Sequence, residues 1–129
     1  MLSGSVAIPT LAVSDLQRAR GFYEGILGLV TEGDSPDGLL YQVGTGSILV
    51  YPSAYAGTNK ATAVSFRVSE DDFDAVVGDL RGKGVSFQTF EFAGISWEDG
   101  VATTGSSRSV WFEDPDGNII NVQSGGGDN

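Results

Sequence analysis

The sequence contains no cysteine and no histidine, and only seven of its 129 residues are lysine or arginine. The lack of cysteine rules out disulfides, thiolate nucleophiles and sulfur-ligated metal sites. The lack of histidine removes the usual general base near neutral pH and the commonest metal ligand. Much familiar enzyme chemistry is therefore excluded.

Two further absences bear on location and partners. No apolar run approaches the ~20 residues that span a bilayer, and the first residues show no basic segment followed by a long apolar one. The net charge of −10, with scattered basic residues, disfavours binding to nucleic acid. We therefore expect one soluble, cytoplasmic domain over residues 1–129 without membrane or nucleic-acid partners. Most of the acidic surface should be solvated, although attraction of a cationic ligand is an alternative.

The first half of the chain has the pattern of a strand, a helix and further strands. Residues 5–13 are apolar-rich and predict a strand, which Pro9 places at an edge, a barrel rim or a bulge. Ser14 and Gln17 match a capping box, so a helix should begin there and end at Gly28. Residues 31–38 have turn chemistry, and residues 39–43 and 47–51 predict a hairpin.

The second half repeats this order after a polar connector. Residues 61–68 alternate as in a half-buried strand, and Ser69 caps a helix that ends near Gly82. Further strands are predicted at the ranges 85–92, 109–113 and 118–123, and residues 93–107 predict a long loop with at most a short strand at 101–104. Residues 124–129 predict a disordered tail.

The repeat indicates two βαβββ modules, at about residues 5–52 and 61–123. We expect an α+β fold in which the modules form a curved mixed sheet around a groove, with the helices on the convex side.

The motifs that flank these elements resemble a known group of proteins. They are Asp15-Leu16, Phe22-Tyr23-Glu24 and Leu27-Gly28-Leu29, together with the segment from Trp111 to Asn118. This combination is similar to the vicinal oxygen chelate superfamily, which includes glyoxalase I, extradiol dioxygenases, fosfomycin-resistance enzymes and bleomycin-resistance proteins. The resemblance extends from residue 5 to residue 123.

The resemblance also implies where a metal would be bound. Metal enzymes of this superfamily carry ligands on the first strand and on the last strand of each module. The resemblance implies Ile8 and Ala63 for the two first strands, about Leu49 for the last strand of the first module, and Asn121 for the last strand of the second. Hydrocarbon side chains cannot ligate a cation, and a lone amide oxygen is a weak donor. We therefore expect neither a metal nor another cofactor.

Strand alternation selects the side chains that would face the groove. That wall mixes apolar and polar groups, which suits an organic ligand of moderate polarity, although the same groups would also fill a tapered sheet. Trp97 lies in a polar loop and is a candidate for stacking, whereas Trp111 is expected in the core. Arg67 suits either an anionic ligand group or an ion pair. The candidate ligand-binding residues are Thr10, Leu49, Tyr51, Ser65, Arg67, Trp97 and Asn121.

The sequence leaves three functions open, the third being an assembly or regulatory module. The first is a binding protein that sequesters an aromatic or cationic organic molecule without metal, similar to bleomycin-resistance proteins. The second is a metal-independent isomerase, lyase or transferase, in which Glu113, Glu91 or Tyr51 would move protons. We favour the non-catalytic binding protein, with no catalytic residue assigned, and the resemblance implies a homodimer.

Overall fold

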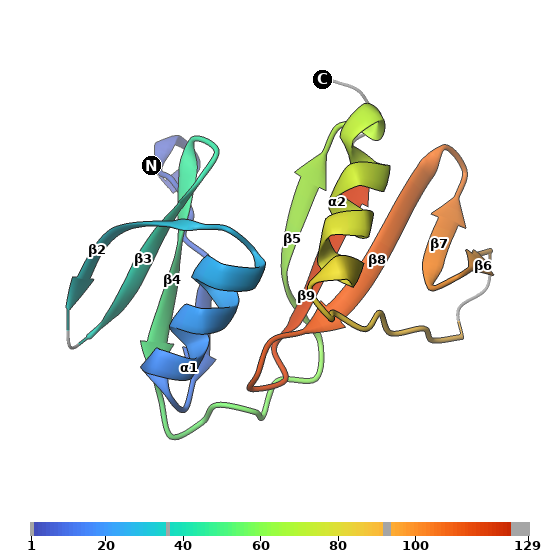
Figure 1. The fold of residues 1–129 in the computed structure, drawn as a ribbon. Helices are drawn as coiled ribbons and strands as arrows, with labels where there is room; N and C mark the ends of the chain where they lie inside the picture. The colour runs from blue at the N-terminus through green and yellow to red at the C-terminus, as the bar shows by residue number, and fades with distance from the viewer. Residues whose placement is uncertain (1, 36, 92–93, 125–129) are drawn as a thin grey trace. The chain divides into compact units, whose positions relative to one another are not determined.

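The structure is a computed structural model that describes residues 2–35, 37–91 and 94–124 (Figure 1). The chain divides into two compact units: residues 1–63 with 114–118, and residues 64–113 with 119–129. Each module carries its own mixed or antiparallel sheet and its own helix, so the predicted α+β class is confirmed. No helix among the described residues has both the length and the apolar character needed to cross a membrane.

The first sheet has the strand order β1-β4-β3-β2. Strands β1 and β4 are parallel, and the other neighbours are antiparallel. The elements that precede and form it are a 3-10 helix at Leu2–Gly4, β1 at Thr10–Val13, α1 at Leu16–Arg20, a π-helical turn at Gly21–Ile26, β2 at Val30–Ser35, β3 at Gly38–Val43 and β4 at Gly46–Pro52.

Three expectations for this part of the chain need correction. The first strand covers only Thr10–Val13; residues 5–8 are exposed, and the Pro9 carbonyl accepts from the Leu49 N–H just before the strand begins. Residues 30–35 form a strand on β3, with a bulge at Glu32, instead of a turn. The cap of α1 is Asp15, whose carboxylate accepts from the backbone N–H groups of Gln17 and Arg18, and not Ser14. Pro9 does precede an edge strand, as its chemistry predicted.

The apolar face of the first sheet packs against α1 and the π-helical turn (Figure 1). Buried and less buried residues alternate along β1 and β4, so one face of each strand is buried. Gly28 follows the turn with φ of +72°, which a glycine adopts without strain. The buried apolar residues of this unit are Leu11, Val13, Ala19, Phe22, Tyr23, Leu39, Tyr41, Ile48 and Val50.

The second sheet has the order β5-β9-β8-β7-β6. Its elements are β5 at Thr62–Val68, α2 at Glu70–Gly82, β6 at Ser96–Glu98, β7 at Val101–Thr104, β8 at Ser107–Glu113 and β9 at Ile119–Ser124. Helix α2 begins at the predicted cap, where the Ser69 hydroxyl accepts from the backbone N–H of Asp72.

The connection from α2 to β7 differs from the sequence prediction. Residues 85–91 form no strand, and residue 92 lies outside the described part of the chain. The predicted loop instead contains β6, which forms a hairpin with β7 across Asp99 and Gly100. Both turn residues have positive φ, as a tight hairpin requires. Ser124, expected in the tail, is buried at the end of β9.

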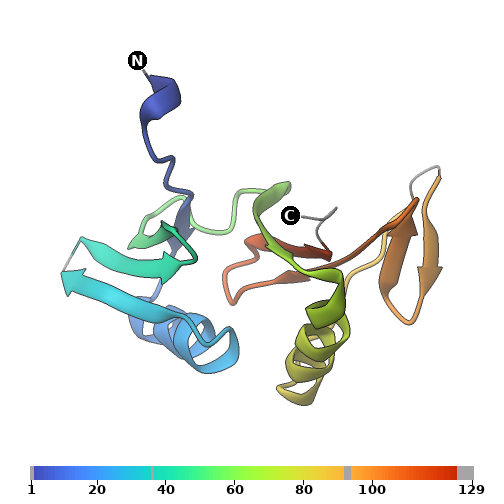
Figure 2. The ribbon, with the colours of Figure 1, turned by 90° about the horizontal axis from the view of Figure 1, so that it is seen from above.

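Helix α2 lies against one face of the second sheet, as Figures 1 and 2 show from two sides. Arg108 on β8 reaches over the Phe73 ring of α2 and pairs with Glu70 and Asp74, so the side chains on this face of β8 point to the helix. The buried apolar residues are Phe73, Val77, Leu80, Ala102, Val110, Phe112, Ile120 and Val122.

Candidate functional site

Three of the predicted site residues share the face of the first sheet that points away from α1. Thr10 and Leu49 are direct cross-strand partners, and Tyr51 lies two residues further along β4. Thr10 is exposed and its hydroxyl donates to the Ile8 carbonyl, whereas Leu49 and Tyr51 are half-buried. The sheet therefore brings these three side chains together, as strand alternation predicted.

An aromatic cluster lies on the face of the second sheet that points away from α2, here called the helix-free face. Trp111 alternates with the buried Val110 and Phe112 and therefore projects to this face. Its ring centroid is 6.0 Å from that of Trp97 and 4.9 Å from that of Phe90. Phe90 also contacts Trp97 at 5.3 Å. Trp111 is half-buried on this face and is not one of the buried core residues, contrary to the expectation from the sequence.

Two side-chain amides extend this cluster. Asn121 is the cross-strand partner of Trp111, and its Nδ2 donates to the Val110 carbonyl at 3.1 Å. The Oδ1 of Asn121 accepts from Gln123 Nε2 at 3.0 Å. The amides form a chain beside the aromatic rings, and Asn121 is buried. Rings with fixed amides beside them can stack a flat molecule and orient its polar groups.

A carboxylate follows along the same face. Glu113 is two residues beyond Trp111 on β8 and is exposed. Its Oε2 accepts from Gln88 Nε2, and the Gln88 backbone N–H donates to the Trp111 carbonyl at 2.7 Å. Residues 88–90 are thereby fixed next to the outer part of the helix-free face.

The remaining predicted residues, Ser65 and Arg67, lie on β5. Both are exposed and alternate with the less exposed Val64, Phe66 and Val68. Strand β9 separates β5 from β8, and Trp97 lies at the opposite edge of the sheet on β6. Four strand spacings amount to roughly 19 Å, so Arg67 and Trp97 do not contact one small group together.

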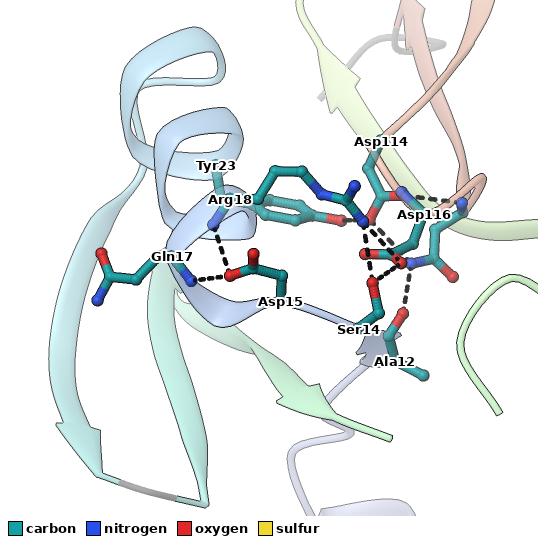
Figure 3. A network of polar contacts seen from close by, with 9 residues as sticks. Ala12, Ser14, Asp15, Gln17, Arg18, Tyr23, Asp114 and Asp116 are labelled. Carbon is teal, nitrogen blue, oxygen red and sulfur yellow. Dashed lines mark hydrogen bonds and ion pairs between the residues drawn. The ribbon is translucent and has the colours of Figure 1, made fainter. Parts of the chain in front are cut away.

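The loop of residues 114–118, which joins β8 to β9, is fixed to the first unit by a buried carboxylate (Figure 3). Asp114 Oδ2 accepts from the Tyr23 hydroxyl at 2.6 Å and from Asn118 Nδ2 at 2.8 Å. Asp114 Oδ1 accepts from the backbone N–H groups of Asp116 and Asn118. Asn118 Nδ2 also donates to the Ala12 carbonyl at 2.8 Å.

A second carboxylate closes the same loop onto the start of α1. Asp116 Oδ1 accepts from the Ser14 hydroxyl at 2.7 Å and from Arg18 Nη2 at 3.1 Å. Figure 3 shows both side chains directed at this carboxylate. We call the contacts of Asp114, Asp116 and Asn118 with Ala12, Ser14, Arg18 and Tyr23 the loop clasp.

The clasp changes the chemistry of Tyr23. Burial, followed by the nearby negative charge of Asp114, raises the pKa of the Tyr23 hydroxyl far above its ordinary value of 10.0. Asp114 has hydrogen-bond donors at both oxygens. A carboxylate satisfied in this way is suited to holding a loop and not to proton transfer.

The residues implied as metal ligands by the family resemblance do not fit a divalent cation. Ile8, Leu49 and Ala63 have hydrocarbon side chains, and the amide of Asn121 is engaged with Val110 and Gln123. Among the described residues no three acidic side chains gather into a group that could hold a metal ion.

Sequence reasoning missed Phe90 and Gln88 as neighbours of the tryptophans. Their segment was predicted as a strand, and its residue pattern does not indicate which strand edge it would lie against. The alternation of Trp111 with Val110 and Phe112 was the available signal that Trp111 leaves the core.

Comparison with known proteins identifies related sequences and folds. The family model described as "Glyoxalase/Bleomycin resistance protein/Dioxygenase superfamily" matches residues 5–122. No curated protein sequence matches the chain.

Solved structures match over nearly the whole chain. An integron cassette protein from the mobile metagenome of the Halifax Harbour sewage outfall is 21% identical, with a TM-score of 0.68, over 94% of this chain and 98% of its own. The fosfomycin resistance protein FosX from Listeria monocytogenes is 16% identical, with a TM-score of 0.73, over 95% of this chain and 93% of its own. Lactoylglutathione lyase from Agrobacterium tumefaciens is 18% identical, with a TM-score of 0.70, over 95% of this chain and 94% of its own. At these identities the likeness concerns the fold alone.

Proposed function

The chain belongs to the glyoxalase/bleomycin resistance protein/dioxygenase superfamily, and we propose that it binds a small organic ligand with a flat, unsaturated part, without metal or cofactor. The observation that carries this proposal is the cluster of Trp97, Trp111 and Phe90 beside the Asn121 amide. Aromatic rings supply stacking area, and the amides supply a few directed hydrogen bonds. The sequence also predicts Thr10, Leu49, Tyr51, Ser65 and Arg67 as ligand-binding residues, and the proposal does not depend on them.

The donor chemistry supports a role without metal. The Listeria FosX has been solved in complex with Mn(II) and sulfate. In this chain the positions implied as ligands offer three hydrocarbon groups and one engaged amide. We expect Mn(II), Zn(II) or Ni(II) to leave the melting temperature unchanged, and no stoichiometric metal in protein purified without chelators. A large stabilisation by one of these ions would contradict the assignment.

Intrinsic fluorescence tests ligand binding directly, because both tryptophans of the chain lie in the cluster. We would titrate the protein with flat heteroaromatic compounds and follow Trp emission and melting temperature. A ligand at about 100 times its Kd stabilises the folded state by about 2.7 kcal/mol, which raises the melting temperature by several degrees. Trp97→Leu should abolish that stabilisation, whereas Tyr55→Leu, an exposed aromatic residue in the first unit, should preserve it.

The outcome against this proposal is equally clear. If neither emission nor melting temperature responds to a broad set of flat compounds, the cluster is a packing feature and the binding function is wrong. If Tyr55→Leu removes the response as fully as Trp97→Leu, the ligand lies elsewhere.

Two of the three groups that the enzymatic alternative would use are exposed carboxylates. Glu113 and Glu91 are exposed, so burial does not prepare them for proton transfer at neutral pH. The buried Asp114 is held by four donors within the loop clasp. We therefore propose a cytoplasmic binding protein and, from the family resemblance, a homodimer. Sedimentation equilibrium tests the dimer, since a mass of 13.4 kDa at all concentrations would refute it.

A further inference from the structure

We propose that the ligand carries a positive charge and that Glu113 selects for it. This inference rests on the proposed function, because Glu113 would bind the charged group of the ligand beside the same tryptophans. It adds a ligand class, protonated or quaternary aromatic amines, and one residue that distinguishes this class from neutral molecules of the same shape.

The first support is the position of Glu113 relative to Trp111. The two residues are separated by one position on β8, so their side chains leave the same face with Cα atoms about 7 Å apart. The hydrogen bond from Gln88 Nε2 holds the Glu113 carboxylate on that face. A cation seated against the Trp111 ring is therefore within reach of the ring and of the carboxylate together.

The second support is the pairing of the charged residues in this unit. Arg108 pairs with Glu70 and Asp74, and Lys83 pairs with Asp79. Arg81 donates to the Asp99 carbonyl and lies over the Phe87 ring. None of these cations pairs with Glu113 in the described part of the chain.

Two more carboxylates add to the negative charge near the cluster. Glu91 follows Phe90 and Glu98 follows Trp97, both are exposed, and neither forms an ion pair within the described residues. Arg67 is the basic residue of β5, and β9 separates its strand from β8. Two strand spacings of about 4.8 Å keep Arg67 roughly 10 Å from the β8 backbone. Within the described residues, Glu91, Glu98 and Glu113 therefore have no Lys or Arg partner.

The face of a tryptophan ring and a carboxylate both attract a cation. The negative face of an indole ring attracts a cation within about 6 Å of its centroid, by about 0.5–2 kcal/mol. A carboxylate at short range adds a Coulomb attraction that salt screens. A neutral ring of equal size gains only the stacking energy, and an anion is repelled.

A matched set of probes tests the proposal. Quinoline at neutral pH, N-methylquinolinium and quinoline carboxylate share one flat ring system and differ in charge. We would measure their affinities by calorimetry and by Trp emission, at low and at high salt. The wild-type protein should bind the cation on the order of 5- to 30-fold more tightly than quinoline, with the advantage reduced by salt.

Substitutions assign the selectivity to one residue. Glu113→Gln keeps the hydrogen-bonding shape and should reduce the preference for the cation at least ~3-fold while leaving quinoline affinity unchanged. Glu113→Asp should retain most of the preference. Asp71→Asn removes the same charge from α2, which covers the other face of the sheet, and should change nothing.

The outcomes separate this inference from the function on which it rests. If no probe binds, the binding function itself is wrong. If the three probes bind equally, or if Glu113→Gln and Asp71→Asn behave alike, the flat-ligand site stands and the charge selection is wrong. If Glu113→Gln weakens the binding of quinoline as much as that of the cation, Glu113 shapes the site but does not select for charge, and the charge selection is wrong.

Discussion

The hydroxyl of Tyr23 is expected to make one of the larger single contributions to the stability of the first unit. Tyr23→Phe removes only this hydroxyl, which donates to Asp114 at 2.6 Å in a buried setting. A hydrogen bond to a charged group contributes about 1.5–3 kcal/mol. Because Asp114 keeps three other donors, the cost should stay in this range and the fold should survive.

Asp114→Ala should cost more, about 3–5 kcal/mol, because it leaves the Tyr23 hydroxyl, the Asn118 amide and two backbone N–H groups without their acceptor. The double variant is the decisive measurement. Once Asp114 is gone, the Tyr23 hydroxyl has lost its partner, so adding Tyr23→Phe should change the free energy of unfolding by less than ~0.5 kcal/mol.

Urea unfolding followed by far-ultraviolet circular dichroism gives these free energies. Tyr41→Phe is the matched control, because Tyr41 is also buried but its hydroxyl donates to Glu24. Its cost should add to that of Asp114→Ala. If the costs of Tyr23→Phe and Asp114→Ala are additive, the hydrogen bond between the two side chains does not stabilise the fold.

Two further expectations follow from buried groups of the first unit. The pKa of Tyr23 and of Tyr41 is raised above the ordinary value of 10.0, mainly by burial, so the unfolded chain loses these protons before the folded chain does. Stability should therefore be fully present below about pH 10 and fall above it, by up to about 1.4 kcal/mol per pH unit for each tyrosine, and melting curves of Tyr23→Phe should show a smaller fall. A wild-type melting temperature that does not change from pH 9 to pH 11 would contradict this predicted loss of stability. Gly38 has φ of +153°, and a Cβ there would lie 2.8 Å from the Val50 carbonyl oxygen. Gly38→Ala should therefore cost about 1–3 kcal/mol, whereas Gly33→Ala in the neighbouring strand, with open space around it, should cost much less; equal costs in urea unfolding would refute the steric argument.

Local chemistry predicted the elements whose ends are fixed by neighbouring residues. The Ser69 cap and the Gly28 stop appear as expected, since both depend on a few adjacent groups. The turn between β8 and β9 closes with the Gly117 N–H donating to the Asp114 carbonyl, as its Asp-Pro-Asp-Gly sequence indicated.

The errors arose where a distant partner decides the conformation. Residues 30–35 contain polar residues and a glycine, and they form a strand because β3 supplies the pairing edge. Residues 85–91 have strand-like composition, but β7 pairs with the first part of β8, at 107–109, and beyond it Gln88 donates one backbone hydrogen bond to Trp111. Propensity does not say which segment pairs with an edge. The candidate site shows the same limit, because alternation placed Thr10, Leu49 and Tyr51 on one face but did not bring Phe90 to the tryptophans.

The loop clasp has a consequence for dividing the chain. From the sequence alone, the chain would be divided in the connector near residue 60, which would give one fragment per repeat. Residues 114–118 would then be encoded with the second fragment, while Ala12, Ser14, Arg18 and Tyr23 would remain in the first. The first fragment would leave Ser14 and Arg18 without the Asp116 carboxylate, and the second would leave Asp114 without the Tyr23 hydroxyl. A recombination or truncation experiment that treats the repeats as interchangeable parts should therefore carry this five-residue loop along with the first repeat.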